Sequence, residues 1–376
     1  MVTVYPIFSL RELKKFARFK TALYKNHPYA VPQLRADEVN ALCRGKNPAL
    51  DVYEHQVFLA EKEGKAVGRI VGIINHIDNE NEGKKRVRFG YIDFIDDVAV
   101  AAALIEAVEK WGAARGMTEI HGPLGFTDLD PEGMLVEGFD QLGTIATIYN
   151  YPYYPQHLEQ LGFQKGADWV EYKLFAIDAI PDKFIKAARI ASQKYGLKVL
   201  PQKSVRQLQK EGYIKKVFEL LNLAYEHLYG FTRVTEEMID YYIKNYLPVL
   251  RADLISIVVN PEGTLVGFGV AIPSLSKALQ KAGGRLFPFG LFHLLRAVKR
   301  RPKVCDLMLI AVHPEYRSLG TVALIFDQLI PRFQSFGTVY AESNPELEDN
   351  YNIQMLWKEF RSEQHKRRRV YEKKIG

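Results

Sequence analysis

Apolar residues along this chain form runs of two kinds, one of strand length and one with helical spacing. Residues 306–312 read Asp-Leu-Met-Leu-Ile-Ala-Val, which predicts a strand buried on both faces. Pro314 ends that strand, and the apolar residues that follow from Val322 recur at helical spacing. Residues 98–115 show the same helical pattern, with one apolar face formed by Ala101, Leu104, Ile105, Val108 and Trp111.

The remaining patterns predict an element order that occurs twice. The order is strand, two helices, a hairpin, strand, helix, strand, helix and strand. In the first half these elements are expected at 1–7, 10–25, 32–44, 57–77, 87–95, 98–115, 118–121, 153–161 and 169–175. In the second half they are expected at 197–200, 205–228, 236–246, 254–272, 306–312, 322–333, 339–342, 350–361 and 368–373. A charged loop is expected at 78–85. Because the pattern repeats and the residues do not, the repeat indicates architecture, an α/β (α+β) fold with two similar domains.

The length of 376 residues also favours two domains. We expect a first domain at 1–178, a linker helix at 179–196 and a second domain at 197–376, with an insertion at 274–303. There is no apolar run of membrane-spanning length and no signal segment at the start, so a cytoplasmic protein without a transmembrane segment is expected. Cys43 and Cys305 lack the spacing of a zinc site, and no metal is expected.

The net charge of +7 is concentrated in two basic clusters, at 296–303 and 365–369. Such clusters suit a phosphorylated cofactor, nucleic acid or a membrane surface, and a solvated basic face has the same composition. Within the insertion, basic residues surround an apolar stripe of Leu291, Leu294, Leu295 and Val298. This inserted basic helix fits a lid over a cofactor, a helix on a membrane surface, or a packed helix with solvated arginines.

The turn after residues 306–312 is the first candidate for a binding site. A buried strand, a tight turn and a helix N-terminus present several unpaired backbone N–H groups at one point, which suits a phosphate or pyrophosphate. Gly320 would let the backbone approach such a ligand closely, and Arg317 would supply a positive charge.

The pattern Val312-x-Pro-x-x-Arg317-x-x-Gly320 resembles the pyrophosphate loop of the GNAT acyltransferases, which use an acyl-coenzyme A donor. That family usually has Gly or Ala two positions after this glycine, where this chain has Val322. Further stretches resemble a largely uncharacterised bacterial family of tandem-GNAT proteins, and they lie at 24–34, 68–76, 94–97, 121–123, 138–140, 149–154, 284–290 and 347–350. The resemblance implies two GNAT-like domains in tandem, each a central mixed sheet flanked by helices.

The resemblance also implies a set of site residues in the second domain. The cofactor-binding set is Val312, Arg317, Ser318, Leu319, Gly320, Thr321, Val322 and Asn350, acting mainly through backbone N–H groups. Glu342 and Asp306 are candidate bases, although each also fits a structural carboxylate. The family's catalytic Tyr falls on Trp357, so Tyr351 is taken as a substitute acid, with Tyr340 as the alternative, although neither stands at the family's position. In the first domain, Asp96 and Asp97 stand where the loop should be. They predict a cap on the helix N-terminus, and we expect that the first domain does not bind coenzyme A.

The function expected from this resemblance is acyl-coenzyme A-dependent N-acyltransfer, with acetyl-coenzyme A as the expected co-substrate. The acceptor would be a small-molecule or peptide amine of unknown identity. Two alternatives stay open. A non-catalytic GNAT-fold binding protein fits Val322 and the missing Tyr, and an aminoacyl-tRNA-dependent transferase of the same fold fits the basic clusters, which permit nucleic acid binding. The oligomeric state does not follow from the sequence.

Overall fold

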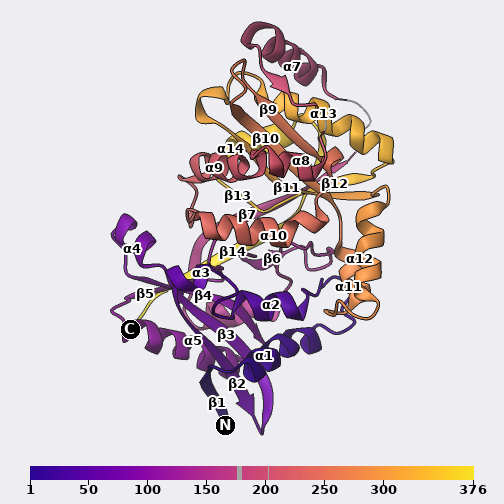
Figure 1. The fold of residues 1–376 in the computed structure, drawn as a ribbon. Coiled ribbons are helices and arrows are strands. Elements are labelled where there is room, and N and C mark those ends of the chain that lie inside the picture. Colours follow the sequence, from indigo (N-terminus) through magenta and orange to yellow (C-terminus); the bar gives the residue numbers. More distant parts are fainter. Residues whose placement is uncertain (176–179, 202) are drawn as a thin grey trace. The chain divides into compact units, whose positions relative to one another are not determined.

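The structure is a computed structural model that describes residues 1–175, 180–201 and 203–376 (Figure 1). Contacts divide the chain into two compact units. Unit 1 comprises Met1–Val170, Ser276–His293 and Lys366–Gly376, and unit 2 comprises Glu171–Leu275 and Leu294–His365. The predicted boundary at 178 and 179 lies outside the described residues. The predicted domain limits, which rest on the repeat of elements, stay a prediction.

Unit 1 holds a mixed sheet with the strand order β1-β2-β3-β4-β5-β14, and β6 pairs with β14. The pair β4–β5 is parallel and is connected through α5, whereas the other pairs are antiparallel. Its elements are β1 (Val2–Ile7), α1 (Leu10–Leu23), α2 (Arg35–Ala41), α3 (Ala49–Val52), β2 (Glu54–Lys62), β3 (Lys65–Ile74), α4 (His76–Glu82), β4 (Arg86–Phe94), α5 (Val98–Ala113), β5 (Glu119–Gly122), β6 (Met134–Glu137), α6 (Tyr153–Gln160) and α11 (Ser276–Ala282).

The strands of unit 2 follow the order β7-β12-β11-β10-β9-β8, in which only β11–β12 is parallel among the described pairs. Its elements are α7 (Asp182–Tyr195), β8 (Lys198–Val199), α8 (Val205–Lys210), α9 (Tyr213–Tyr225), α10 (Glu236–Tyr246), η1 (Leu247–Val249), η2 (Ala252–Leu254), β9 (Ile255–Val259), β10 (Leu265–Pro273), β11 (Val304–Val312), η3 (Pro314–Tyr316), α13 (Thr321–Phe336), β12 (Tyr340–Ser343), β13 (Glu346–Leu347) and α14 (Tyr351–Trp357).

Three elements continue from one unit into the other along the chain. They are β7 (Gln164–Phe175), α12 (Gly290–Lys299) and β14 (Arg361–Lys374). Apart from them, helices cover the sheet of each unit and bury its apolar side chains. In unit 2, α7 packs against α13, so the helix predicted as a linker belongs to a hydrophobic core. The expected α/β fold with a mixed sheet and flanking helices in each half is confirmed.

Two predicted elements were wrong. Residues 78–85 were expected as a charged loop, but α4 covers most of them because the Asn75 side chain accepts a hydrogen bond from the amide of Asp78 and caps the helix. Residues 205–228 were expected as one helix, but Gly212 has a φ of 79° and separates α8 from α9. Within the described part of the chain, no helix is long and apolar enough to cross a membrane.

Candidate functional site

The strands β11 and β12 of unit 2 run together and then part. Their parallel pairing extends from Val304 opposite Tyr340 to Leu307 opposite Ser343. On its other edge, β11 stays paired with β10 as far as Val312. Beyond Leu307 the edge that faces away from β10 is met by side chains, since Asn344 Nδ2 donates to the Met308 carbonyl at 2.7 Å and the Tyr225 hydroxyl donates to the Ile310 carbonyl at 2.9 Å.

The turn after β11 ends in a long helix whose N-terminus has no side-chain cap. Gly320 is the N-cap of α13 and has a φ of 83°, in the left-handed region. The first amides of any helix lack intrahelical partners, so this N-terminus offers donors and a positive dipole end to an anion. The corresponding helix of unit 1 differs, because Asp97 caps α5 by accepting from the amide of Ala99 at 3.0 Å. The helix cap predicted for Asp97 is therefore confirmed.

Residues of the predicted phosphate loop (312–322) contact other parts of unit 2. Arg317 is exposed and its Nη2 donates to the carbonyl of Ala224 at 3.1 Å. A Cβ at Gly320 would lie 2.6 Å from the carbonyl oxygen of Ala187 in α7, so close packing and positive φ both require glycine here. Thr321 is buried, and its hydroxyl donates to the carbonyl of Tyr316 at 2.8 Å. Gly320 and Thr321 therefore serve packing, and the amides of the first turn of α13 remain as backbone donors to a phosphate.

The two predicted bases lie side by side where β11 and β12 begin to part. Asp306 of β11 and Glu342 of β12 are opposite each other in the parallel pairing, and both are buried. Residues that pair across neighbouring strands project from the same face of a sheet. The structure therefore brings together two carboxylates that lie 36 positions apart in the chain.

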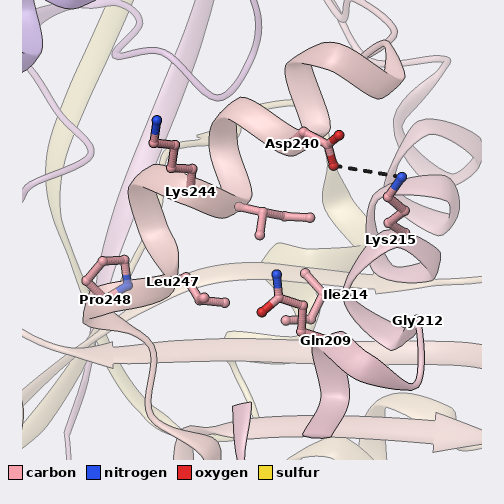
Figure 2. A pocket seen from close by; sticks show the side chains of 9 residues that line it. Gln209, Gly212, Ile214, Lys215, Asp240, Lys244, Leu247 and Pro248 are labelled. Carbon is pink, nitrogen blue, oxygen red and sulfur yellow. Dashed lines mark ion pairs between the residues drawn. The ribbon is translucent and has the colours of Figure 1, made fainter. Parts of the chain in front are cut away.

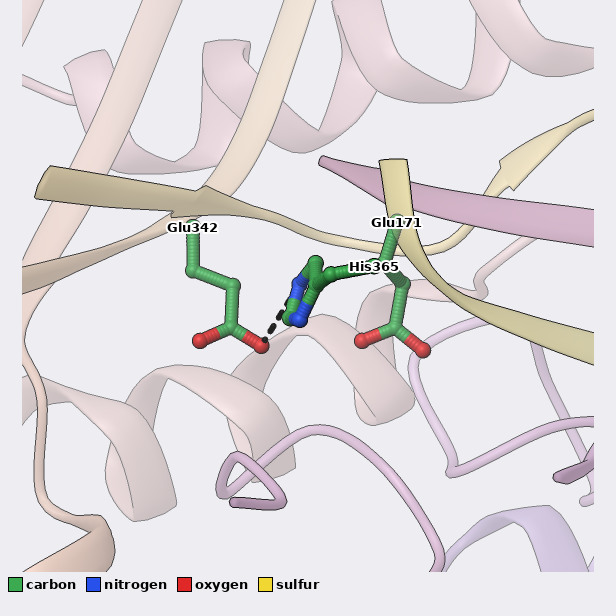
Figure 3. Close-up of side chains that lie close together, drawn as sticks. All are labelled: Glu171, Glu342 and His365. Carbon is green, nitrogen blue, oxygen red and sulfur yellow. Dashed lines mark ion pairs between the residues drawn. The ribbon is translucent and has the colours of Figure 1, made fainter. Parts of the chain in front are cut away.

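Two buried groups that the sequence analysis missed join Glu342. His365 Nε2 lies 3.4 Å from Glu342 Oε1, and Glu171 of β7 completes a cluster whose potential ligand atoms lie within 4.8 Å of one another (Figure 3). Glu171, Glu342 and His365 are named here the Glu–Glu–His cluster. A histidine next to a carboxylate can accept and hold a proton, and the same three groups could also hold a divalent metal ion.

A further buried carboxylate, Glu346, contacts the residue that replaces the family's tyrosine. Trp357 Nε1 donates to both carboxylate oxygens of Glu346, at 2.9 and 2.8 Å. Burial, helped by the negative charge of Glu171, raises the pKa of Glu346 to about 8. Glu346 is therefore a neutral acid at pH 7. Tyr351, by contrast, is 71% exposed at the start of α14, and Asn350 makes no side-chain cap bond there.

A surface hollow of unit 2 of about 590 Å³ lies between α8, α9 and α10 (Figure 2). Asp240 and Lys215 form an ion pair of 3.8 Å at its rim. The hollow shares no lining residue with the Glu–Glu–His cluster or the phosphate loop, and its lining is Gln209, Gly212, Ile214, Lys215, Asp240, Ile243, Lys244, Leu247 and Pro248.

Two curated proteins are similar to this chain over most of its length. No family model matches the chain. It is 30% identical to protein YghO of Escherichia coli over 372 residues, covering 97% of this chain and 93% of that protein. It is also 30% identical to the bacterial ceramide synthase of Caulobacter vibrioides over 299 residues, covering 79% of this chain and 77% of that protein.

Solved structures with a similar fold include a tandem GNAT protein and a probable N-acyltransferase. A tandem GNAT protein from the clavulanic acid biosynthesis pathway has a TM-score of 0.58 at 11% identity, covering 100% of this chain and 99% of that one. A probable N-acyltransferase from Enterococcus faecalis has a TM-score of 0.52 at 10% identity, covering 100% and 73%. The chain therefore belongs to the family that includes protein YghO and the bacterial ceramide synthase, and it has the fold of a tandem GNAT protein.

Proposed function

We propose that this protein transfers an acyl group from acyl-coenzyme A directly to a primary amine. The observation that carries the proposal is the parting of β11 from β12 beside the uncapped N-terminus of α13. Beyond Leu307 this edge of β11 is met by side chains and not by β12, and the helix N-terminus supplies anion donors next to it. In an acyl-coenzyme A donor, the thioester needs a hydrogen-bond donor for its carbonyl oxygen, and the pyrophosphate needs anion-binding amides.

The backbone of unit 2 would hold the donor. Amides of Ser318, Leu319, Gly320, Thr321 and Val322 would bind the pyrophosphate at the start of α13. The amide of His313 donates to the Val266 carbonyl of β10 at 2.9 Å. Because amide directions alternate along a strand, the Val312 amide points away from β10, toward the side where β12 departs. That amide would stabilise the oxyanion formed on the thioester carbonyl.

The buried carboxylates would move the protons of the reaction. The amine nitrogen forms a bond to the thioester carbon while Glu342, paired with His365, accepts a proton from it. Asp306 would lie beside this base as a second acceptor. The carbon–sulfur bond then breaks, and the departing thiolate takes a proton from Glu346, which is neutral at pH 7. Acyl-coenzyme A supplies the activated acyl group, and Tyr351 and Asn350 have no role in this scheme.

The acceptor that we propose is a long-chain amino alcohol. The name of the Caulobacter relative refers to ceramide, an amide of a fatty acid with such an amine. A long-chain acyl group would then replace acetyl as the preferred donor. Small-molecule or peptide amines without a long chain would be poorer acceptors.

Binding of the donor is tested by calorimetry with acetyl- and palmitoyl-coenzyme A, comparing Val322→Glu with Val322→Gln. The side chain of Val322 is half-buried in the first turn of α13. A glutamate there suits the helix dipole, so folding should be preserved, but its charge repels phosphate. We expect Val322→Glu to bind at least about tenfold more weakly than Val322→Gln. Equal binding by the two variants contradicts the assignment of the phosphate loop.

Catalysis is tested by following thiol release with a long-chain amino alcohol as acceptor. We expect Glu342→Gln to lower kcat about 100-fold or more while donor binding is retained. Asp306→Asn is the matched variant, since this neighbouring carboxylate should matter less. A wild-type protein that binds no acyl-coenzyme A, with an intact fold, would instead be a non-catalytic member of the fold. Salt-sensitive binding of aminoacyl-tRNA would point to the alternative donor.

A further inference from the structure

The segment 285–301 displays aromatic side chains to solvent in an unusual number. Phe287, Phe289 and Phe292 are 69%, 72% and 59% exposed, and Leu291 and Leu295 are exposed as well. Three phenylalanines within six positions form a contiguous apolar stretch of chain, whereas single exposed apolar residues are normal. Such a stretch marks an interaction surface.

The charged residues that flank these side chains along the chain have one sign only. Between Glu262 and Asp306 the chain has eight Lys or Arg residues and no Asp or Glu. Arg285 precedes the phenylalanines, and Arg296, Lys299, Arg300 and Arg301 follow them, all exposed. Within unit 1, burial lowers the pKa of Arg35, and the nearby charges of Arg285 and Arg18 lower it further. Positive charge therefore flanks the apolar side chains on both sides along the chain.

The start of the segment is fixed to the body of unit 1. Gln280 Nε2 of α11 donates to the carbonyls of Pro28 and Ala30, at 2.9 and 3.1 Å. The amide of Arg35 donates to the carbonyl of Gly284 at 3.1 Å. The phenylalanines thus follow a well-anchored point of the chain and lead into α12.

We infer that the segment 285–301 docks on an anionic lipid surface. Aromatic and aliphatic side chains would enter the boundary between headgroups and acyl chains, and the arginines and lysines would meet the lipid phosphates. The absence of acidic residues over this whole stretch matches such a surface. The helix α12 has 10 residues, about 15 Å, so it lies in the interface and does not span the bilayer.

The inference is tested by sedimenting the full chain with vesicles. One set consists of phosphatidylcholine, and the other contains phosphatidylcholine with about one third phosphatidylglycerol. We expect binding to the anionic vesicles and at least about tenfold weaker binding after Arg300→Glu together with Arg301→Glu. The triple change Phe287→Ser, Phe289→Ser and Phe292→Ser should weaken it similarly. The control is Phe8→Ser, which removes an equally exposed phenylalanine from another part of unit 1.

A second readout does not depend on loss of binding. Phe292→Trp should show a blue-shifted emission with anionic vesicles and none with phosphatidylcholine alone, because the ring enters a less polar medium. No sedimentation and no blue shift with anionic vesicles overturns the inference. An equal loss of vesicle binding in Phe8→Ser also overturns it. Self-association that only the triple variant abolishes overturns it as well, because this face would then be a contact between two copies of the chain. Neither readout uses acyl-coenzyme A, so failure here is distinct from failure of the proposed function.

Discussion

At the scale of the residue, Glu346 shows how a buried carboxyl group ties stability to pH. Its pKa is raised to about 8 by burial, above the usual value of 4.5 that holds in the unfolded chain. Between these values the unfolded chain releases a proton that the folded protein keeps. The contribution to stability is therefore full below about pH 4.5 and declines as the pH rises toward 8.

Glu346→Gln should remove this decline, because an amide cannot ionise and still accepts a hydrogen bond from Trp357. We expect the free energy of unfolding of the variant, relative to wild type, to rise by about 3–4 kcal/mol between pH 5 and pH 8. Urea unfolding at several pH values measures the difference. Asp349→Asn, on an exposed residue of the same region, is the control. A difference that is constant with pH would show that Glu346 is ionised in the folded protein.

At the scale of the element, the two helices that follow β4 and β11 differ in their N-cap residue. Asp97 caps α5 and also forms an ion pair of 3.2 Å with Lys62, which together hold its pKa below 3.8. Asp97→Ala should cost about 1 kcal/mol at pH 7. This loss should vanish as the pH falls through the pKa of Asp97. Asp96→Ala, on an exposed neighbour paired with His157, should cost less than about 0.5 kcal/mol. Thermal unfolding of both variants at pH 7 and pH 3 tests the contrast.

The same elements explain which features could be predicted from the sequence. The helix at 98–115 follows from periodicity, because it buries one continuous set of apolar side chains, and the strand at 306–312 follows from its unbroken apolar run. The predicted burial of that strand on both faces was wrong for residues 307–310, which are only half-buried. Asp306 and Glu342 were each predicted as candidate bases, but their pairing was not predicted, because Asp306 was placed at the start of its strand and Glu342 at the end of its strand. The Glu–Glu–His cluster could not be predicted from the sequence. Glu171, Glu342 and His365 meet only through the order and register of β7, β12 and β14. His365 was counted only as part of a basic cluster.

At the scale of the whole molecule, the division into two units separates two kinds of buried charge. Unit 2 collects carboxylates next to the proposed reaction centre, whereas the main buried charge of unit 1 is a neutralised network. Arg69 is fully buried and lies 2.6 Å from Glu38 and 2.7 Å from Asp93, with its guanidinium over the ring of Phe16. Fixed in this way, Arg69 joins α2 to the strands β3 and β4 and fits a structural role.

Arg69→Met should destabilise the protein by about 3–5 kcal/mol, because two buried carboxylates lose their counter-charge. Neutralising the partners as well, in Arg69→Met with Glu38→Gln and Asp93→Asn, should recover at least about 2 kcal/mol of that loss. Hydrogen exchange resolved by segment should place the single variant's added exchange in β2, β3 and β4 of unit 1. Exchange in β10 and β11 of unit 2 should change little, since the units have separate cores. Equal added exchange in both units would mean that they unfold as one cooperative body, and Arg69 would then support the reaction centre of unit 2 as well.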